Sequence, residues 1–128
     1  MNAKQEKTVL IVEDELLIVL ELEETLRELG YNKVVTFSNV DAAMAWLHRA
    51  LPDIAITDYH LRNEVADELI RALAASTVPI VVYSGRSLDL ADSDVLKACE
   101  WLMKPADERM LATAIARACR LGDVATIP

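Results

Sequence analysis

The sequence predicts an α/β fold, a doubly wound, five-stranded parallel sheet with helices on both faces. Short apolar runs alternate five times with segments of helical periodicity along the 128 residues. Polar and acidic residues stand directly after several of these runs, as expected where parallel strands end at one edge of a sheet. A hydrophobic fraction of 53% supplies a core and argues against intrinsic disorder. We therefore expect one compact domain.

Five short runs have the length and composition of buried strands, because they are apolar and rich in β-branched residues. They are Val9–Val12, Lys33–Phe37, Asp53–Thr57, Pro79–Ser84 and Trp101–Met103. Each is followed by a longer segment, so the strands are expected to be parallel and joined by crossover helices.

The segments after these strands are predicted as helices, with Tyr59–Asn63 as a loop. The predicted helices are Glu15–Leu29, a segment that starts at Ser38 and ends before Pro52, Glu64–Ala75, Leu88–Ala98 and Ala106–Leu121. In the first helix, Val19, Leu22 and Leu26 recur every three or four residues and predict its buried face. Gly30 is predicted to terminate that helix.

Capping residues refine the second and last helices. Ser38 is predicted as the N-cap of the second, with Asp41 three residues on. Its inward positions are predicted to be Ala43, Leu47 and Ala50. For the last helix, acidic residues suit the N-terminus and basic residues the C-terminus. Its buried positions are predicted to be Leu111, Ile115 and Ala118 or Cys119, and the tail Gly122–Pro128 is expected to fray.

Composition narrows the class of protein. The formal net charge of −8 argues against a direct grip on nucleic acid, which needs a basic patch. Cys99 and Cys119 lack metal-ligand spacing and are expected to be buried free thiols, as in a reducing cytoplasm. No signal peptide or membrane-spanning run is visible. We expect a single domain over residues 1–128, with its core at about 8–121 and no output domain.

Five side chains carry the chemistry. Glu13 and Asp14 follow the first strand, Asp58 the third, Ser84 ends the fourth, and Lys104 follows the fifth. These residues would meet at one sheet edge, where three carboxylates repel each other unless a divalent cation lies among them. A lysine and a hydroxyl opposite them could hold a phosphoryl group. The pattern therefore predicts a metal-dependent phosphoryl-transfer site.

This order of residues resembles the receiver domains of two-component response regulators, of the stand-alone type. The resemblance covers Val9 to about Leu121 and rests on the acidic pair, the aspartate, the serine and Lys104-Pro105 at successive strand ends. It implies a flavodoxin-like strand order of 2-1-3-4-5. It also implies phosphotransfer from a histidine kinase or a histidine phosphotransfer protein.

The resemblance also implies a role for each site residue. Asp58 corresponds to the phosphoacceptor, and carboxylates are recognised nucleophiles for forming aspartyl phosphates. Asp14 corresponds to a direct ligand of Mg²⁺, Glu13 to an acid that acts through a metal-bound water, and the backbone carbonyl of His60 to a further ligand. Ser84 and Lys104 correspond to the groups that bind the phosphoryl oxygens. Such charges stabilise the transition state of phosphoryl transfer.

Other positions are expected to modulate the site. The Lys104-Pro105 bond is often cis in the family, which proline permits. Trp101 stands where the family usually has a Tyr or Phe that switches on activation, so it is either a switch or a core or interface tryptophan. His60 is expected to tune dephosphorylation, and His48 to lie on the surface. The loop after Asp58 lacks the proline and glycine of many receivers.

Structural roles are the alternatives for the same residues. The acids of Glu13–Glu15 could cap the first helix and favour its dipole. Asp58 could cap the helix that follows it. Lys104 could be a solvent-exposed lysine at a strand end, with Pro105 starting a helix.

Three other classes compete with a phosphorylated receiver. A receiver-like scaffold would not respond to phosphorylation, and the intact site residues argue against it. A haloacid-type phosphatase would need an aspartate at the position of His60 and a cap domain. A flavin protein would need a phosphate-binding loop where Glu13–Glu15 would repel phosphate. For a receiver, we expect a monomer or weak dimer whose output surface is helix four, strand five and helix five, with Trp101 and the acids Asp89, Asp92 and Asp94.

Overall fold

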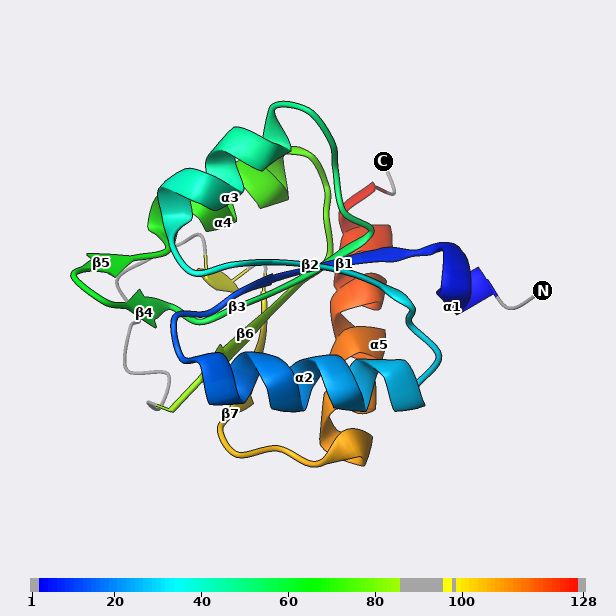
Figure 1. Cartoon of the computed structure of the whole chain (residues 1–128). Helices are drawn as coiled ribbons and strands as arrows, with labels where there is room; N and C mark the ends of the chain where they lie inside the picture. The colour runs from blue at the N-terminus through cyan, green and yellow to red at the C-terminus, as the bar shows by residue number, and fades with distance from the viewer. Residues whose placement is uncertain (1–2, 86–95, 98, 127–128) are drawn as a thin grey trace.

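A computed structural model describes residues 3–85, 96–97 and 99–126 of the chain. Its main sheet is parallel and has the strand order β2-β1-β3-β6-β7. These strands are β1 (Thr8–Val12), β2 (Lys33–Phe37), β3 (Ile54–Thr57), β6 (Ile80–Ser84) and β7 (Glu100–Met103). The predicted fold class and strand order are therefore confirmed, and β6 and β7 are the fourth and fifth predicted strands (Figure 1).

Helices cover both faces of the sheet. The helices of the described residues are α1 (Ala3–Glu6), α2 (Leu16–Glu28), α3 (Val40–Leu47), α4 (Asp67–Ala75) and α5 (Glu108–Thr126). Helices α2 and α5 lie on one face, and α3 and α4 on the other (Figure 1). In the described part of the chain, no helix is long and apolar enough to cross a membrane.

Strand β1 shows how one run of sequence supplies two cores. Val9 and Ile11 point into the core that α2 and α5 cover, and Leu10 and Val12 into the core that α3 and α4 cover. All four side chains are fully buried. Side chains of a strand alternate between faces, so a central strand with both faces covered must be apolar throughout.

The end of α2 confirms the predicted role of Gly30. This glycine has a φ of 103°, and its N–H donates to the carbonyl of Arg27 at 3.0 Å. The N–H of Tyr31 donates to the carbonyl of Leu26 at 2.9 Å. These two bonds form a Schellman motif, in which a residue with positive φ lets the chain satisfy the last carbonyls of the helix.

Helix α3 differs from its prediction. Its N-cap is Asn39, whose side chain accepts from the N–H of Ala42 at 2.8 Å, so the assignment of Ser38 was wrong. Asn and Ser are comparable N-caps, and side-chain periodicity does not separate two adjacent ones. Ala50 is exposed because α3 ends at Leu47, short of the predicted boundary.

The predictions near the C-terminus had mixed outcomes. Helix α5 continues to Thr126, so it does not end at Leu121 as predicted, and the last two residues of the tail expected to fray lie outside the described residues. One glycine weakens a helix by about 1 kcal/mol but does not forbid it. The face of α5 was correctly predicted, since Leu111, Ile115 and Ala118 are buried. Of the predicted helix Leu88–Ala98, only residues 96–97 are described, in a 3₁₀ turn, so the helix and its aspartates lie outside the described residues.

The segment after β3 is the largest departure. It was expected to be a loop followed by a helix from Glu64, but it forms an antiparallel hairpin of β4 (His60–Leu61) and β5 (Glu64–Val65). The hairpin lies beside the carboxyl edge of the main sheet (Figure 1). Its turn is made by Arg62 and Asn63, and Asn63 has a φ of 64°. Asparagine tolerates this left-handed conformation better than most residues.

Candidate functional site

The carboxyl edge of the sheet brings the predicted site residues together. Backbone pairing continues past the strands: the N–H of Asp58 donates to the carbonyl of Val12 at 3.0 Å, and the N–H of Lys104 to that of Ser84 at 2.8 Å. Strands β1 and β3 therefore deliver their acidic residues side by side, and β7 delivers Lys104 from the far side of β6. The order of strands, more than any local motif, assembles this site.

Three carboxylates form a tight cluster. One oxygen from each of Glu13, Asp14 and Asp58 lies within 4.8 Å of the others. The exposed fraction is 3% for Glu13 and 8% for Asp58, whereas Asp14 is partly exposed. Like charges this close, and largely out of water, destabilise each other unless a cation balances them.

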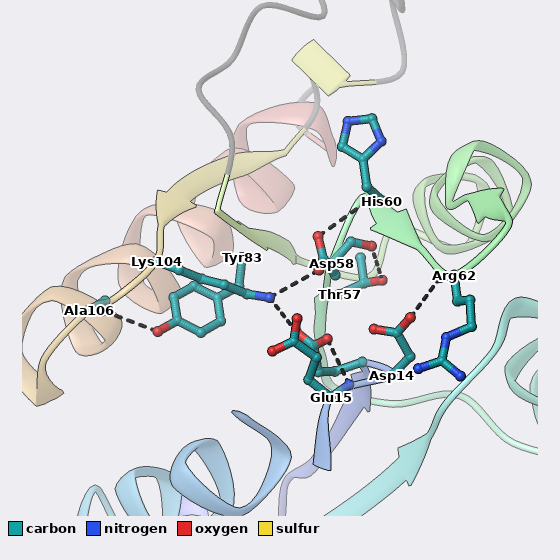
Figure 2. A network of polar contacts seen from close by, with 10 residues as sticks. Asp14, Glu15, Thr57, Asp58, His60, Arg62, Tyr83, Lys104 and Ala106 are labelled. Carbon is teal, nitrogen blue, oxygen red and sulfur yellow. Dashed lines mark hydrogen bonds and ion pairs between the residues drawn. The ribbon is translucent and has the colours of Figure 1, made fainter. Parts of the chain in front are cut away.

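Lys104 supplies one such cation. Its Nζ lies 2.6 Å from Oε1 of Glu13. It also lies 3.0 Å from Oδ2 of Asp58 (Figure 2). Burial alone would lower the pKa of Lys104, but hydrogen bonds to these two acids raise it above its ordinary value. Burial raises the pKa of Glu13, and the bond from Lys104 only partly offsets this. Pairing therefore outweighs burial at the lysine, and burial outweighs pairing at the glutamate.

Backbone N–H groups hold each carboxylate in place. Asp14 Oδ2 accepts from the N–H of Arg62 at 2.6 Å, and Asp58 Oδ1 accepts from that of His60 at 3.2 Å (Figure 2). Glu13 accepts from the N–H of Glu15 at 3.2 Å. These bonds orient the acids toward one another, as pre-organisation of a site requires.

The helix-capping alternatives are wrong for both aspartates. The N-cap of α2 is Glu15, which makes no side-chain cap bond, while Asp14 faces the hairpin. Asp58 lies far in sequence from the start of α4 at Asp67 and bonds to His60 instead. Lys104 is likewise not a solvent-exposed strand end, since its side chain is only 14% exposed.

Ser84 and the turn after β7 complete the edge. Ser84 is 1% exposed and ends β6, and a Cβ added at the neighbouring Gly85 would meet no atom of the described residues within 4 Å. The Lys104-Pro105 peptide is cis, as predicted. After this turn, the N–H of Ala106 donates to the hydroxyl of Tyr83 at 3.1 Å, which ties the turn to β6.

Trp101 and His60 occupy different surroundings. Trp101 is partly buried against the core under α3 and α4, with its ring centroid 6.4 Å from that of Tyr59. Its indole N–H is the one buried side-chain polar atom without a hydrogen-bond partner among the described residues. The His60 imidazole points away from the carboxylates, so only its backbone faces Asp58 (Figure 2). His48 is exposed, as predicted.

Sequence reasoning missed two functional features. Arg62 contributes a backbone N–H to Asp14, and any residue except proline could do so, so no side-chain signal existed. Tyr83 is uncharged, but its hydroxyl accepts the hydrogen bond that holds the turn after Lys104. Its ring centroid lies 5.6 Å from the lysine Nζ. Its place one residue before Ser84 was the available signal.

The donor set fits a hard divalent cation. It consists of carboxylate oxygens, and Mg²⁺ typically binds through one or two carboxylates, waters and phosphate oxygens. Burial raises the pKa of Glu13 even with Lys104 bonded to it, so a divalent cation beside the cluster would favour the charged form of this acid. The cluster has no sulfur or imidazole ligand of the kind that zinc prefers.

The sequence belongs to a known family. Residues 9–116 match the family model for the response regulator receiver domain. This match covers most of the chain and includes all of the predicted site residues. The protein is therefore a member of the receiver domains of two-component systems. Among curated proteins, none matches this sequence significantly.

Solved structures share the fold of this chain. SdrG from Sphingomonas melonis Fr1 is 34% identical, with a TM-score of 0.78 over 92% of this chain and 98% of that chain. A sensor protein from Polaromonas sp. JS666 is 25% identical, with a TM-score of 0.78 over 91% and 98%. The receiver domain of the sensor histidine kinase PA1611 from Pseudomonas aeruginosa PAO1 is 24% identical, with a TM-score of 0.75 over 89% and 98%, and has a magnesium ion coordinated in its active site cleft.

Proposed function

We propose that this receiver accepts a phosphoryl group on Asp58 from a histidine kinase or a histidine phosphotransfer protein. The observation that carries the proposal is the position of Asp58. It is a largely buried carboxylate that shares an ammonium with one acid and lies against another. This setting offers a nucleophile and the charges that a transferred phosphoryl group needs.

The proposed transfer is a single displacement at phosphorus. A carboxylate oxygen of Asp58 forms the new P–O bond while the P–N bond of the donor phosphohistidine breaks, and the electron pair returns to the imidazole nitrogen. Lys104 shifts its ammonium from the carboxylate to a phosphoryl oxygen, and the Ser84 hydroxyl binds another. Bound Mg²⁺ would supply positive charge for the phosphoryl oxygens. Gly85 is small and would leave room for the donor.

We assign the metal ligands from the hydrogen bonds that already occupy them. Both oxygens of Glu13 accept hydrogen bonds, from Lys104 and from Glu15. In the described part of the chain, only the Arg62 N–H donates to Asp14, which leaves that acid free to bind the ion directly. Glu13 would then act through a metal-bound water. Both oxygens of Asp58 also accept hydrogen bonds, from His60 and Lys104, so we propose Asp58 and the backbone carbonyl of His60 as the remaining protein ligands from the resemblance to the family.

The output is proposed to be protein contact, through the surface of β7 and α5 together with the segment between β6 and β7. Trp101 lies on β7 beside Tyr59, which follows the acceptor, so a shift of Asp58 can reach it. We also propose a monomer or weak dimer in the cytoplasm, because the two cysteines of the sequence do not form the pattern of a disulfide framework. The net charge of −8 disfavours nucleic acid as a target.

A phosphatase has less support than a receiver. A haloacid-type mechanism needs a carboxylic acid two residues after the nucleophile, and His60 stands there with its ring turned away (Figure 2). We therefore propose no enzymatic role beyond magnesium-dependent self-phosphorylation and dephosphorylation.

Mass spectrometry of the intact protein tests the acceptor. Treatment with acetyl phosphate and Mg²⁺ is expected to add one phosphoryl group to the wild type and none to Asp58→Asn. Asp41→Asn is the matched control, because Asp41 is an exposed aspartate outside the site. Unchanged labelling of Asp58→Asn would overturn the assignment of the acceptor. No labelling of the wild type would favour a scaffold.

Fluorescence tests the coupling. Beryllofluoride with Mg²⁺ imitates a bound phosphoryl group and is expected to change the emission of Trp101 in the wild type but not in Asp58→Asn. Trp46 supplies a constant background. It packs near Phe37 on the edge strand β2, whereas Trp101 lies on β7 at the opposite edge of the sheet. Labelling without a fluorescence change would show a receiver whose tryptophan is structural.

A further inference from the structure

We propose that Glu64 is a positioning residue for the metal site, acting through the β4–β5 hairpin on Asp14. The inference rests on the proposed binding of Mg²⁺ and extends it to a residue outside the carboxylate cluster. Glu64 lines the same hollow as Asp14, but its hydrogen bond in the described part of the chain goes to Val40 and not to the three acids. It fastens the hairpin that carries the Arg62 N–H, and that N–H holds Asp14.

The first contact lies between the hairpin and α3. Oε2 of Glu64 accepts from the N–H of Val40 at 3.2 Å, across 24 residues of sequence. This N–H belongs to the first turn of α3, where no intrahelical acceptor exists. Asn39 caps the same turn by accepting from Ala42, so Glu64 supplies a second acceptor that comes from another element. The hairpin is thereby attached to the start of a helix.

The second contact lies at the hairpin turn. The N–H of Arg62 donates to Oδ2 of Asp14 at 2.6 Å, across 48 residues of sequence. In the register of the hairpin, Leu61 pairs with Glu64, so the turn of Arg62 and Asn63 directly joins the paired residues. The carboxylate of Glu64 and the N–H of Arg62 therefore belong to the same short hairpin.

The base of the hairpin is fixed independently. Leu61 is buried, and the N–H of Ala66 donates to the carbonyl of Tyr59 at 2.9 Å. The hydroxyl of Tyr59 donates to Asp67 at 2.8 Å. With the base held by these contacts, loss of Glu64 is expected to free the turn without unfolding the hairpin.

Freeing the turn would affect the metal site because Asp14 is the most exposed of the three acids. Repulsion from Glu13 and Asp58 favours turning Asp14 toward water, and the Arg62 N–H opposes that movement. Groups that orient metal ligands typically change metal affinity about 10–100-fold. Glu64 acts one step further away, so we expect its truncation to weaken Mg²⁺ binding roughly threefold to tenfold.

A purely structural role makes a different prediction. If Glu64 only caps α3, truncation would lower the free energy of unfolding and leave the Mg²⁺ affinity unchanged. If Glu64 acts only through its charge, loss of any nearby exposed acid would weaken Mg²⁺ binding similarly. The hydrogen bond and the charge of residue 64 must therefore be varied separately while the Mg²⁺ affinity is measured.

Titration of the full chain with magnesium chloride, followed by amide NMR, separates these cases. Glu64→Ala is expected to bind Mg²⁺ roughly threefold to tenfold more weakly than the wild type. The Arg62 amide resonance of the metal-free variant should also move upfield, as it loses its carboxylate partner. Glu64→Gln keeps an oxygen for the Val40 N–H, so it should restore both readouts. Asp41→Ala removes a charge from the same helix start and should leave both unchanged.

Two results would overturn the proposal. One is wild-type affinity and an unmoved Arg62 resonance in Glu64→Ala. The other is equal weakening in Glu64→Ala, Glu64→Gln and Asp41→Ala, which would assign the effect to charge. Asp14→Asn distinguishes failure of the proposed function. If the wild type and Asp14→Asn respond alike to Mg²⁺, the metal site itself is wrong, and the role of Glu64 falls with it.

Discussion

Replacement of Lys104 by methionine tests how the metal-free site is held together. The side chain is retained in length but loses its charge, so Glu13 and Asp58 lose their shared ammonium at 2.6 and 3.0 Å. The exposed fraction of the side chain is 14% for Lys104, 2% for Glu13 and 10% for Asp58, so solvent screens the two ion pairs weakly. Removing one partner of a buried ion pair typically costs about 3–5 kcal/mol.

The expected loss lies near the lower end of this range, about 3 kcal/mol, because Glu13 can take up a proton. Its pKa is already raised by burial and would rise further without the lysine. A group with a raised folded-state pKa contributes stability below its unfolded pKa and loses it as pH rises through the folded value. The difference between Lys104→Met and the wild type should therefore grow as pH rises above about 4.3.

Urea denaturation followed by circular dichroism measures this loss. Lys33→Met is the matched control, because Lys33 is exposed on β2 and its replacement should change the free energy of unfolding by about 0.5 kcal/mol or less. Added Mg²⁺ should stabilise Lys104→Met more than the wild type, since the ion no longer competes with the ammonium. A loss in Lys104→Met no larger than in Lys33→Met, at neutral pH and without Mg²⁺, would refute the reasoning.

Three further outcomes are expected. Leu69→Ala should lower the free energy of unfolding by about 2–5 kcal/mol in urea denaturation, because Leu69 is fully buried. The control Leu17→Ala should change it little, because Leu17 is 68% exposed. Equal effects of the two substitutions would contradict the packing of α4. Asn39→Ala should cost about 1 kcal/mol in the same assay, whereas Ser38→Ala should cost much less, and the reverse order would restore Ser38 as the cap. Burial raises the pKa of Cys99 to about 12, so iodoacetamide should alkylate it slowly in the folded protein near neutral pH and fast in urea. Peptide mass spectrometry measures the alkylation. Fast reaction of the folded protein would show an accessible thiolate.

The sheet could be predicted from sequence because its strands are buried on both faces. Runs such as Val9–Val12 have no polar position, and their composition alone separates them from the amphipathic helices between them. Parallel strands then place the residues that follow them at one edge. This geometry is why Asp58 and Lys104, 46 residues apart, could be predicted to meet before any contact was known.

The hairpin could not be predicted in the same way. Its strands have two residues each, too few for alternation to show, and the stretch from Glu64 into α4 also suits a helix start. Asn63 was the only local signal for the turn, through its tolerance of positive φ. The contact of Arg62 with Asp14 uses a main-chain N–H, which side-chain chemistry does not reveal.

The hydrogen bonds of the site also explain how it can respond to phosphorylation. Lys104 is shared between Glu13 and Asp58, so it cannot bind a phosphoryl group on Asp58 without loosening its bond to Glu13. Glu13 would then be a buried acid without an ammonium, a state that burial already disfavours by raising its pKa. A divalent cation beside Asp14 would replace the missing charge. Metal binding and phosphorylation should therefore favour each other, because both act through the charge balance of the same carboxylates.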